Sequence, residues 1–134
     1  FKHINDACGH LAGDETIVRV ANIMTRYLPQ QAQAIRFGGD EFMVVLPKHT
    51  AQQAAEYAEK VRSWVRTEPC CAASNTPVTM SFGVAQMKPD ETLHDVISRS
   101  DHALYRSKEN GRDRVTVLSE QGKELTFSSF KESA

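Results

Sequence analysis

The sequence has few cysteines, no long apolar run and no excess of charge of one sign. Its cysteines are Cys8, Cys70 and Cys71, an odd number with an adjacent pair. This usage predicts reduced thiols, because it lacks both the even count of a disulfide framework and the paired spacing of a zinc site. No segment approaches the about 20 apolar residues that cross a membrane. The net charge of −1 argues against a general nucleic-acid-binding protein, which needs a basic surface.

The composition is that of an ordinary globular protein. Hydrophobic residues make up 40% of the 134 positions and charged residues 25%, a balance typical of soluble domains. This length suits one domain built around one core. The chain begins at Phe1 rather than at a methionine, so we expect it to be a piece of a longer protein.

Three segments have the periodicity of amphipathic helices. In residues 14–28, apolar residues recur at three- and four-residue steps, with Asp14 as the expected N-cap. A second helix is expected to begin at Thr50, which can form a capping box with the glutamine three residues on. A third is expected between Thr92 and Gly111, a glycine suited to end a helix. The residues expected on the buried faces of these helices include Val18, Trp64, Leu93 and Tyr105.

Four short segments have the composition of strands. The second is apolar at every position, which predicts a place inside a sheet, and Gly38 and Gly39 before it predict a two-residue hairpin turn. The third has a face of small residues, including Gly83, that suits close packing by a helix. The fourth is expected to be an edge strand, and residues 68–76 a loop. The four segments are residues 34–37, 42–46, 78–84 and 115–118.

The expected order is helix, strand, strand, helix, strand, helix, strand. Strands separated by helices indicate an α/β or α+β sandwich in which helices cover a mixed sheet. Relative to a ferredoxin-like βαββαβ core, this order lacks one strand at its beginning. Residues 119–134 are polar with few apolar anchors, so we expect a loosely held tail.

Two adjacent carboxylates at the predicted hairpin are the strongest candidates for chemistry. Asp40 and Glu41 directly follow Gly38 and Gly39. Paired carboxylates repel one another, and a hard cation such as Mg²⁺ relieves the repulsion while still binding substrate phosphates. The glycines would let a phosphate approach the backbone closely. The alternative is a polar turn whose acids are only solvated.

Two further polar clusters each have a functional and a structural interpretation. Asn5 and Asp14, with His10 between them, offer donors and acceptors that suit the edge of a guanine. Alternatively, Asp14 is only a helix cap. Lys108 and Arg112 flank the end of the last predicted helix and suit phosphate. Alternatively, Lys108 only complements the helix dipole.

Four motifs, taken in order, resemble those of the GGDEF family. Residues 1–14 resemble the pattern FKxINDxxGHxxGD, and residues 38–42 are the GGDEF signature itself. Residues 81–85 resemble the strand SxGVA, and residues 101–115 resemble the closing motif ADxALYxAKxxGRNRV. The resemblance covers nearly the whole chain to residue 118, and four ordered motifs at family spacing make it specific.

The resemblance implies an α+β fold: a ferredoxin-like βαββαβ-type sandwich in which helices surround a central mixed sheet, as in nucleotidyl cyclases. Residues 1–118 would be the GGDEF domain without its first strand, and residues 119–134 the loosely ordered tail. The family carries an Asp-x-Asp strand before the Phe-Lys pair, so a further aspartate ligand for the metal is expected upstream of Phe1.

The activity implied by the resemblance is that of a diguanylate cyclase, a nucleotidyltransferase that condenses two GTP molecules into cyclic di-GMP with release of pyrophosphate. The implied cofactor is Mg²⁺ or Mn²⁺. Each domain would bind one GTP, so the catalytic unit would be a two-fold homodimer. The resemblance also implies an upstream sensor or regulatory domain, no nucleic acid polymer as partner, and a cytoplasmic location for this domain, with or without a membrane anchor in the full-length protein.

The resemblance also assigns roles to individual positions. Asp40 and Glu41 would be catalytic and would hold the metal, and Asp40 would promote deprotonation of the attacking 3′-hydroxyl. The implied substrate-binding residues are Phe1 and Lys2 in the loop around the triphosphate, Asn5 and Asp14 at guanine, Gly38 and Gly39 at the phosphates, and Lys108 and Arg112 at the terminal phosphates. His10 matches a further position associated with substrate.

One departure from the family pattern concerns regulation. Many members carry an inhibitory Arg-x-x-Asp site, whose positions here are Pro29 and Ala32, so no product inhibition through that site is expected. Two other interpretations remain: a degenerate GGDEF domain that binds GTP or a protein partner without turnover, and a structural ferredoxin-like module without nucleotide. The intact acids Asp40 and Glu41 favour the active enzyme.

Overall fold

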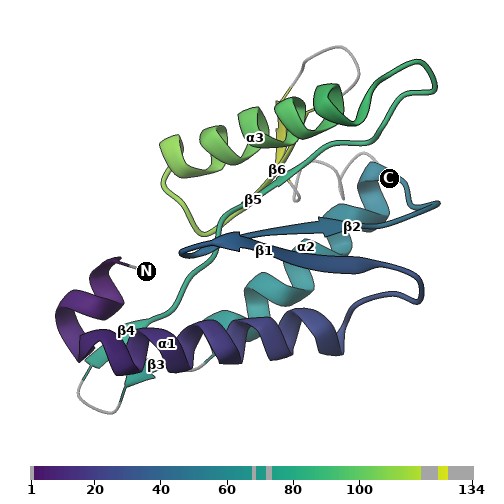
Figure 1. The fold of residues 1–134 in the computed structure, drawn as a ribbon. Helices are drawn as coiled ribbons and strands as arrows, with labels where there is room; N and C mark the ends of the chain where they lie inside the picture. Colours follow the sequence, from purple (N-terminus) through teal and green to yellow (C-terminus); the bar gives the residue numbers. More distant parts are fainter. Residues whose placement is uncertain (1, 68, 72–73, 119–123, 127–134) are drawn as a thin grey trace. The chain divides into compact units, whose positions relative to one another are not determined.

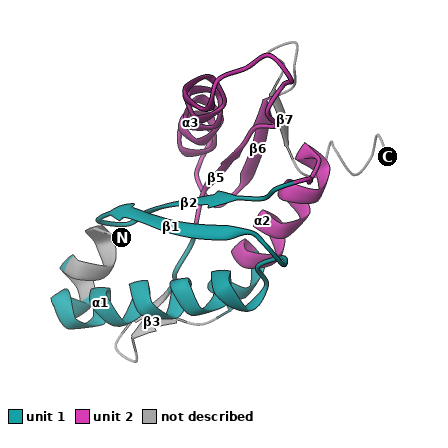
Figure 2. Ribbon diagram, turned by 45° about the vertical axis from the view of Figure 1, so that its right-hand side comes forward, with its two compact units in different colours: residues 1–47, 63–79 teal, residues 48–62, 80–134 magenta. Residues whose placement is uncertain are grey.

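The structure is a computed structural model that describes residues 2–67, 69–71, 74–118 and 124–126. Along the chain, helices are separated by groups of consecutive strands (Figure 1). The chain divides into two compact units (Figure 2): unit 1 comprises residues 1–47 and 63–79, and unit 2 comprises residues 48–62 and 80–134. The elements are α1 (Lys2–Arg26), β1 (Gln33–Gly38), β2 (Glu41–Val45), α2 (Ala51–Arg66), β3 (Pro69–Cys71), β4 (Ser74–Pro77), β5 (Phe82–Val84), α3 (Leu93–Glu109), β6 (Val115–Leu118) and β7 (Glu124–Thr126).

Among the described residues, no helix combines sufficient length with sufficient apolar character to cross a bilayer.

The first helix of unit 1 starts earlier than the sequence predicts. Gly9 has φ 87° and ψ 167°, which are not helical values, so α1 consists of two helical pieces that meet there. The predicted N-cap Asp14 lies inside the second piece, and the capping prediction is wrong. Glycine inside a helix costs about 1 kcal/mol, but Gly13 is buried within this piece and is tolerated there.

The buried face of α1 differs by one position from the predicted face. Ile17, Val20 and Met24 are buried, at spacings of three and four residues. Val18 was expected beside them but is 60% exposed, because the next position along a helix turns by about 100° away from such a stripe. Trp64 of α2 is also 48% exposed, and its ring stacks on Tyr27 with centroids 6.1 Å apart.

Strands β1 and β2 form the predicted hairpin in unit 1. They pair antiparallel, with Ile35 opposite Met43 and Gly38 opposite Glu41, and the register shifts between Arg36 and Gly38. The prediction that the second strand lies inside a sheet is not met among the described strands, because β2 pairs only with β1. Its central residues are accordingly half-buried rather than buried.

Two predictions for unit 1 fail because they depend on contacts distant in sequence. Residues 68–76 were expected to be a loop, but β3 and β4 within this range pair antiparallel. Cys8 is in a disulfide bond, so the prediction of reduced thiols throughout is wrong. The helix that carries Cys8, α1, packs against β3, and cysteine spacing alone does not reveal such proximity.

Unit 2 contains a three-stranded mixed sheet in the order β5-β6-β7. β5 pairs parallel with β6, and β6 pairs antiparallel with β7. β6 was predicted to be an edge strand, because β7 was not expected. It is instead the central strand, and it is buried along its whole length. The predicted strand 78–84 is regular only over Phe82–Val84. Of the predicted tail, residues 119–134, the structure describes only β7, and residues 119–123 and 127–134 lie outside the described residues.

Helix α3 packs on β5 and β6, as the small face of β5 predicted. A Cβ atom added to Gly83 would lie 2.2 Å from both the Leu104 nitrogen and the Ser100 oxygen, so only glycine allows this approach. Leu93 and Tyr105, which were expected on the buried face of α3, are each 61% exposed. The core of unit 2 consists of Ala55, Ala58, Val84, Val115 and Val117.

Helices α2 and α3 begin at the predicted caps. The Gln53 N–H donates to Thr50 Oγ1 at 3.2 Å, and the Thr50 N–H donates to Gln53 Oε1 at 2.8 Å. Thr92 and Asp95 form the equivalent capping box on α3. Gly111, with φ 115°, follows the end of α3 in the left-handed region, as expected. Local signals therefore define these helix ends.

A charged cluster fixes the connection from β5 to α3. The Arg99 guanidinium donates to both carboxylate oxygens of Glu91 and to the Gln86 carbonyl oxygen, and the Lys88 N–H donates to Glu91 at 2.8 Å. The Arg99 hydrogen bonds and then the Lys88 N–H lower the pKa of Glu91 from 4.5 to about 2.

This lowered pKa predicts an acid-sensitive contribution to stability. A carboxylate with a depressed folded pKa stabilises the protein above its unfolded pKa and loses this contribution as the pH falls through the folded pKa. We expect wild type to have a larger free energy of unfolding than Glu91→Gln. The difference should be fully present above pH 4.5 and should disappear as the pH falls toward 2. Urea unfolding at a series of pH values measures it.

A matched control for this prediction is Glu56→Gln, an exposed glutamate of α2. Its difference from wild type should show no comparable change over the same pH range. A pH-independent difference for Glu91→Gln would contradict the assigned role of the ionised carboxylate.

Candidate functional site

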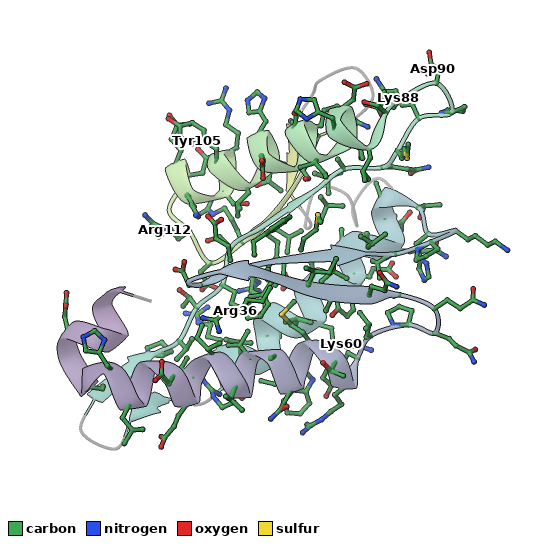
Figure 3. The ribbon with its side chains drawn as sticks, viewed as in Figure 1. Arg36, Lys60, Lys88, Asp90, Tyr105 and Arg112 are labelled. Atoms are coloured by element: carbon green, nitrogen blue, oxygen red, sulfur yellow. The ribbon has the colours of Figure 1, made fainter. Side chains whose placement is uncertain are left out.

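The tip of the β1–β2 hairpin is closed by an arginine. The Arg36 guanidinium donates to the Gly39 carbonyl oxygen through Nε at 3.1 Å and through Nη2 at 2.6 Å. Figure 3 labels Arg36 on this hairpin. The turn residues are Gly39 and Asp40, because Gly38 already pairs with Glu41. The predicted Gly38–Gly39 turn is therefore one residue out of register, a consequence of the irregularity after Arg36.

Both glycines of the tip have backbone conformations that favour glycine. Gly38 has φ 134° and Gly39 has φ 54°, and residues with a Cβ rarely adopt such values. A Cβ atom added to either glycine would meet nothing within 4 Å. Packing therefore does not explain these glycines, and the space beside the backbone is open to a ligand.

The two acids of the tip are exposed. Asp40 lies in the turn and Glu41 begins β2. Among the residues that the structure describes, no group of three or more histidine, cysteine or acidic side chains is arranged to hold a metal ion. Mg²⁺ typically takes only one or two carboxylates and completes its shell with water and substrate phosphates. The donor set of Asp40 and Glu41 therefore fits a Mg²⁺ that binds together with a phosphorylated substrate.

The predicted guanine-binding residues lie on α1, in the same unit as the hairpin. In Figure 1 the tip of the hairpin points toward the N-terminal half of α1. His10 and Asp14 belong to this half, and both are exposed. Asn5 and Lys2 belong to the first piece of α1. Phe1 lies outside the described residues.

The predicted phosphate-binding cations lie in unit 2. Lys108 is in the last turn of α3, and Arg112 is in the turn that follows it; both are exposed. The Arg112 side chain points outward from this turn (Figure 3). The structure therefore brings these two cations to the same end of α3, as predicted, while the hairpin acids and the α1 residues belong to unit 1.

Sequence reasoning missed the residues that hold the turn of Arg112. Arg62 Nη1 donates to Asp113 Oδ1 at 2.8 Å, and the Asp113 N–H donates to Ser81 Oγ at 3.2 Å. Arg62 and Asp113 are 51 residues apart in sequence. The signals in the sequence are an arginine on α2 and an aspartate beside Arg112, and such features are too common to indicate a pair.

The chain matches a known protein family over most of its length. Residues 1–114 match the family described as "Diguanylate cyclase, GGDEF domain". The chain is similar to diguanylate cyclase A of Treponema denticola, with 40% identity over 119 residues, covering 87% of this chain and 32% of that protein. It is 37% identical to diguanylate cyclase DgcM of Escherichia coli K12 over 116 residues, or 86% of this chain and 28% of that protein. The chain thus spans less than a third of these relatives.

Solved structures show the same fold. The GGDEF domain of DgcB from Caulobacter crescentus, in complex with c-di-GMP, superposes with a TM-score of 0.80 at 38% identity, over 87% of this chain and 70% of that one. The active GGEEF domain of a diguanylate cyclase from Vibrio cholerae gives a TM-score of 0.82 at 32% identity, over 89% and 76%. The predicted α+β fold, the nucleotidyl-cyclase-like fold of these domains, is confirmed. The chain belongs to the GGDEF family of diguanylate cyclase domains.

Proposed function

We propose that this chain is the catalytic domain of a diguanylate cyclase that condenses two GTP molecules into cyclic di-GMP. The observation that carries the proposal is the hairpin tip, where Asp40 and Glu41 are exposed beside two glycines in conformations that favour glycine. Open space surrounds both glycines. Such a tip suits a triphosphate approaching the backbone, and the family supplies the reaction.

The reaction balances as two phosphoryl-type transfers. In each, the 3′-oxygen of one GTP forms a bond to the α-phosphorus of the other, and the bond to the bridging oxygen of pyrophosphate breaks. Asp40 promotes loss of the 3′-hydroxyl proton. Asp40 and Glu41 would hold Mg²⁺ (or Mn²⁺). When bound, this ion would neutralise negative charge on the phosphates. A further aspartate ligand is proposed upstream of Phe1.

The substrate assignments extend the proposal to other residues. Guanine is recognised by Asn5 and Asp14, whose amide and carboxylate match its donors and acceptor. Lys108 and Arg112 neutralise the terminal phosphates, and their exposure at the end of α3 supports this role. The remaining proposed substrate contacts are those of Phe1, Lys2, His10, Gly38 and Gly39.

The proposal includes partners of the domain. Each domain binds one GTP, so two copies related by a two-fold axis complete the reaction. An upstream sensor or regulatory domain controls this encounter, and the domain works in the cytoplasm, where GTP is available. A strand before Phe1 is also proposed.

Incubation of the full-length protein with GTP and Mg²⁺, followed by nucleotide analysis, tests the proposal. We expect cyclic di-GMP and pyrophosphate in a molar ratio of about one to two, as the stoichiometry of two transfers requires. GTP binding without turnover would instead support the alternative of an inactive domain that serves as a GTP-binding or protein-interaction module. The intact acids Asp40 and Glu41 favour the enzyme.

We also expect this protein to lack product inhibition through the Arg-x-x-Asp site. Its positions here are Pro29 and Ala32, which close a turn in which the Ala32 N–H donates to the Pro29 carbonyl oxygen at 3.1 Å. Neither side chain can pair with a phosphate or a guanine. Initial rates should therefore be unchanged by micromolar cyclic di-GMP.

The double variant Pro29→Arg with Ala32→Asp tests whether these positions can carry an inhibitory site. It introduces the charged pair of the family site, and any inhibition by cyclic di-GMP should then appear only in the variant. Micromolar inhibition of wild type that substitutions at residues 29–32 relieve would contradict the expectation.

A further inference from the structure

The turn that carries Arg112 has an unusual backbone. Gly111, Arg112 and Asp113 have successive φ values of 115°, 63° and 47°. Residues other than glycine rarely adopt this left-handed region, and two in succession persist only when the surrounding structure holds them. The direction in which Arg112 leaves the surface therefore depends on the contacts that hold this turn.

Each end of the turn is tied to a neighbouring element. The Arg112 N–H donates to the Ser107 carbonyl oxygen of α3 at 2.8 Å. The Asp113 N–H donates to Ser81 Oγ at 3.2 Å, just before β5. The Arg114 Nε donates to the Arg112 carbonyl oxygen at 3.0 Å. These bonds fix the backbone, and the Asp113 side chain also accepts a hydrogen bond.

That contact comes from Arg62 on α2, which lies between two carboxylates. Its Nη1 donates to Asp113 Oδ1 at 2.8 Å, and its Nε donates to Glu59 Oε2 at 2.8 Å. The Arg62 and Asp113 side chains are only 18% and 19% exposed. Glu59 directs the planar guanidinium, and a partly buried pair with this geometry is stronger than an exposed one.

We infer that Arg62 is a positioning residue for Arg112, acting through Asp113. The inference rests on the proposed function, in which Arg112 binds the terminal phosphates of GTP. Arg62 itself faces Glu59 and Asp113 and has no direct role in binding substrate. It maintains the left-handed turn from which Arg112 projects (Figure 3), because displacement of such a group by about 1 Å is enough to weaken its contact with substrate.

Steady-state kinetics of the full-length protein with GTP test the inference. We expect Arg112→Ala to raise KM by about 10- to 100-fold, as expected for loss of a charged hydrogen-bond donor. Arg62→Ala should raise KM about fivefold, with kcat within about twofold of wild type, because it weakens ground-state binding. Arg62→Lys, which can keep one ion pair with Asp113, should restore part of the affinity.

The double variant separates positioning from a general structural role. In an Arg112→Ala background, Arg62→Ala should add nothing to KM, because the group that it positions is absent. Arg106→Ala is the matched control: Arg106 is another arginine of α3, and it pairs with Glu109 at 2.9 Å. It should leave KM at the wild-type value.

Each contrary outcome identifies a different failure. An unchanged KM for Arg112→Ala would refute the phosphate-binding role in the proposed function and, with it, this inference. A raised KM for Arg112→Ala together with an unchanged KM for Arg62→Ala would overturn the inference alone. The inference would also be overturned by an equal increase in KM from Arg62→Ala in both backgrounds, since that result would show that Arg62 acts independently of Arg112.

Discussion

Asp40→Ala is expected to reduce the rate of cyclic di-GMP formation by about 10³-fold, because loss of a positioned base alone costs about 10²- to 10⁴-fold. The same carboxylate is a proposed metal ligand, which adds to the loss. Asp40 is exposed in a turn, so the free energy of unfolding should change by no more than about 0.5 kcal/mol. Initial rates with GTP and Mg²⁺, together with thermal unfolding, measure both effects.

Two variants are matched controls for this result. Asp40→Glu keeps the carboxylate and should retain activity, since the similar domain from Vibrio cholerae is an active GGEEF domain. Asp90→Ala removes an exposed aspartate from a different turn (Figure 3) and should be fully active. Equal rates for Asp40→Ala and wild type would refute the role proposed for the hairpin tip.

Gly83→Ala is expected to destabilise the protein by about 3 kcal/mol or more, the upper end for overpacking in a well-packed core. The added methyl group would lie 2.2 Å from backbone atoms of Ser100 and Leu104. Backbone of a packed helix cannot move aside as the end of a flexible side chain can, so α3 must shift from β5. Urea unfolding measures the loss, and reduced soluble yield should accompany it.

Gly39→Ala adds the same methyl group where nothing lies within 4 Å, so it is the matched control for Gly83→Ala. Its loss of stability comes from the backbone alone, because Gly39 has φ 54°. We expect the free energy of unfolding to fall by about 1–2 kcal/mol. If Gly83→Ala were as stable as wild type, α3 would not pack on β5 as the structure shows.

The features that the sequence predicts correctly depend on neighbouring residues. The capping box at Thr50, the helix cap at Thr92 and the glycine after α3 each depend on residues a few positions apart, so their chemistry is visible in the sequence. The small face around Gly83 is a similar local pattern. The candidate site residues Gly38 to Glu41 are likewise consecutive, and their role in catalysis stays a prediction.

The features that it does not predict depend on contacts between distant segments. Periodicity gives the apolar stripe of a helix but not its phase against a neighbour, so Val18 and Tyr105 were wrongly expected to be buried. The place of β6 inside its sheet depends on β7, a short strand without an apolar pattern. The pairing of Arg62 with Asp113 follows from α2 lying beside the turn after α3, which no sequence pattern shows.

The bond from Arg36 to the Gly39 carbonyl oxygen has a consequence for how tightly a ligand can bind. A glycine-rich tip is free to adopt many conformations, and a ligand that selects one of them loses affinity to the entropy of ordering. Arg36 restricts this freedom before any ligand arrives. Preorganisation of this kind leaves more of the contact energy available as affinity, although Arg36 need not touch the ligand.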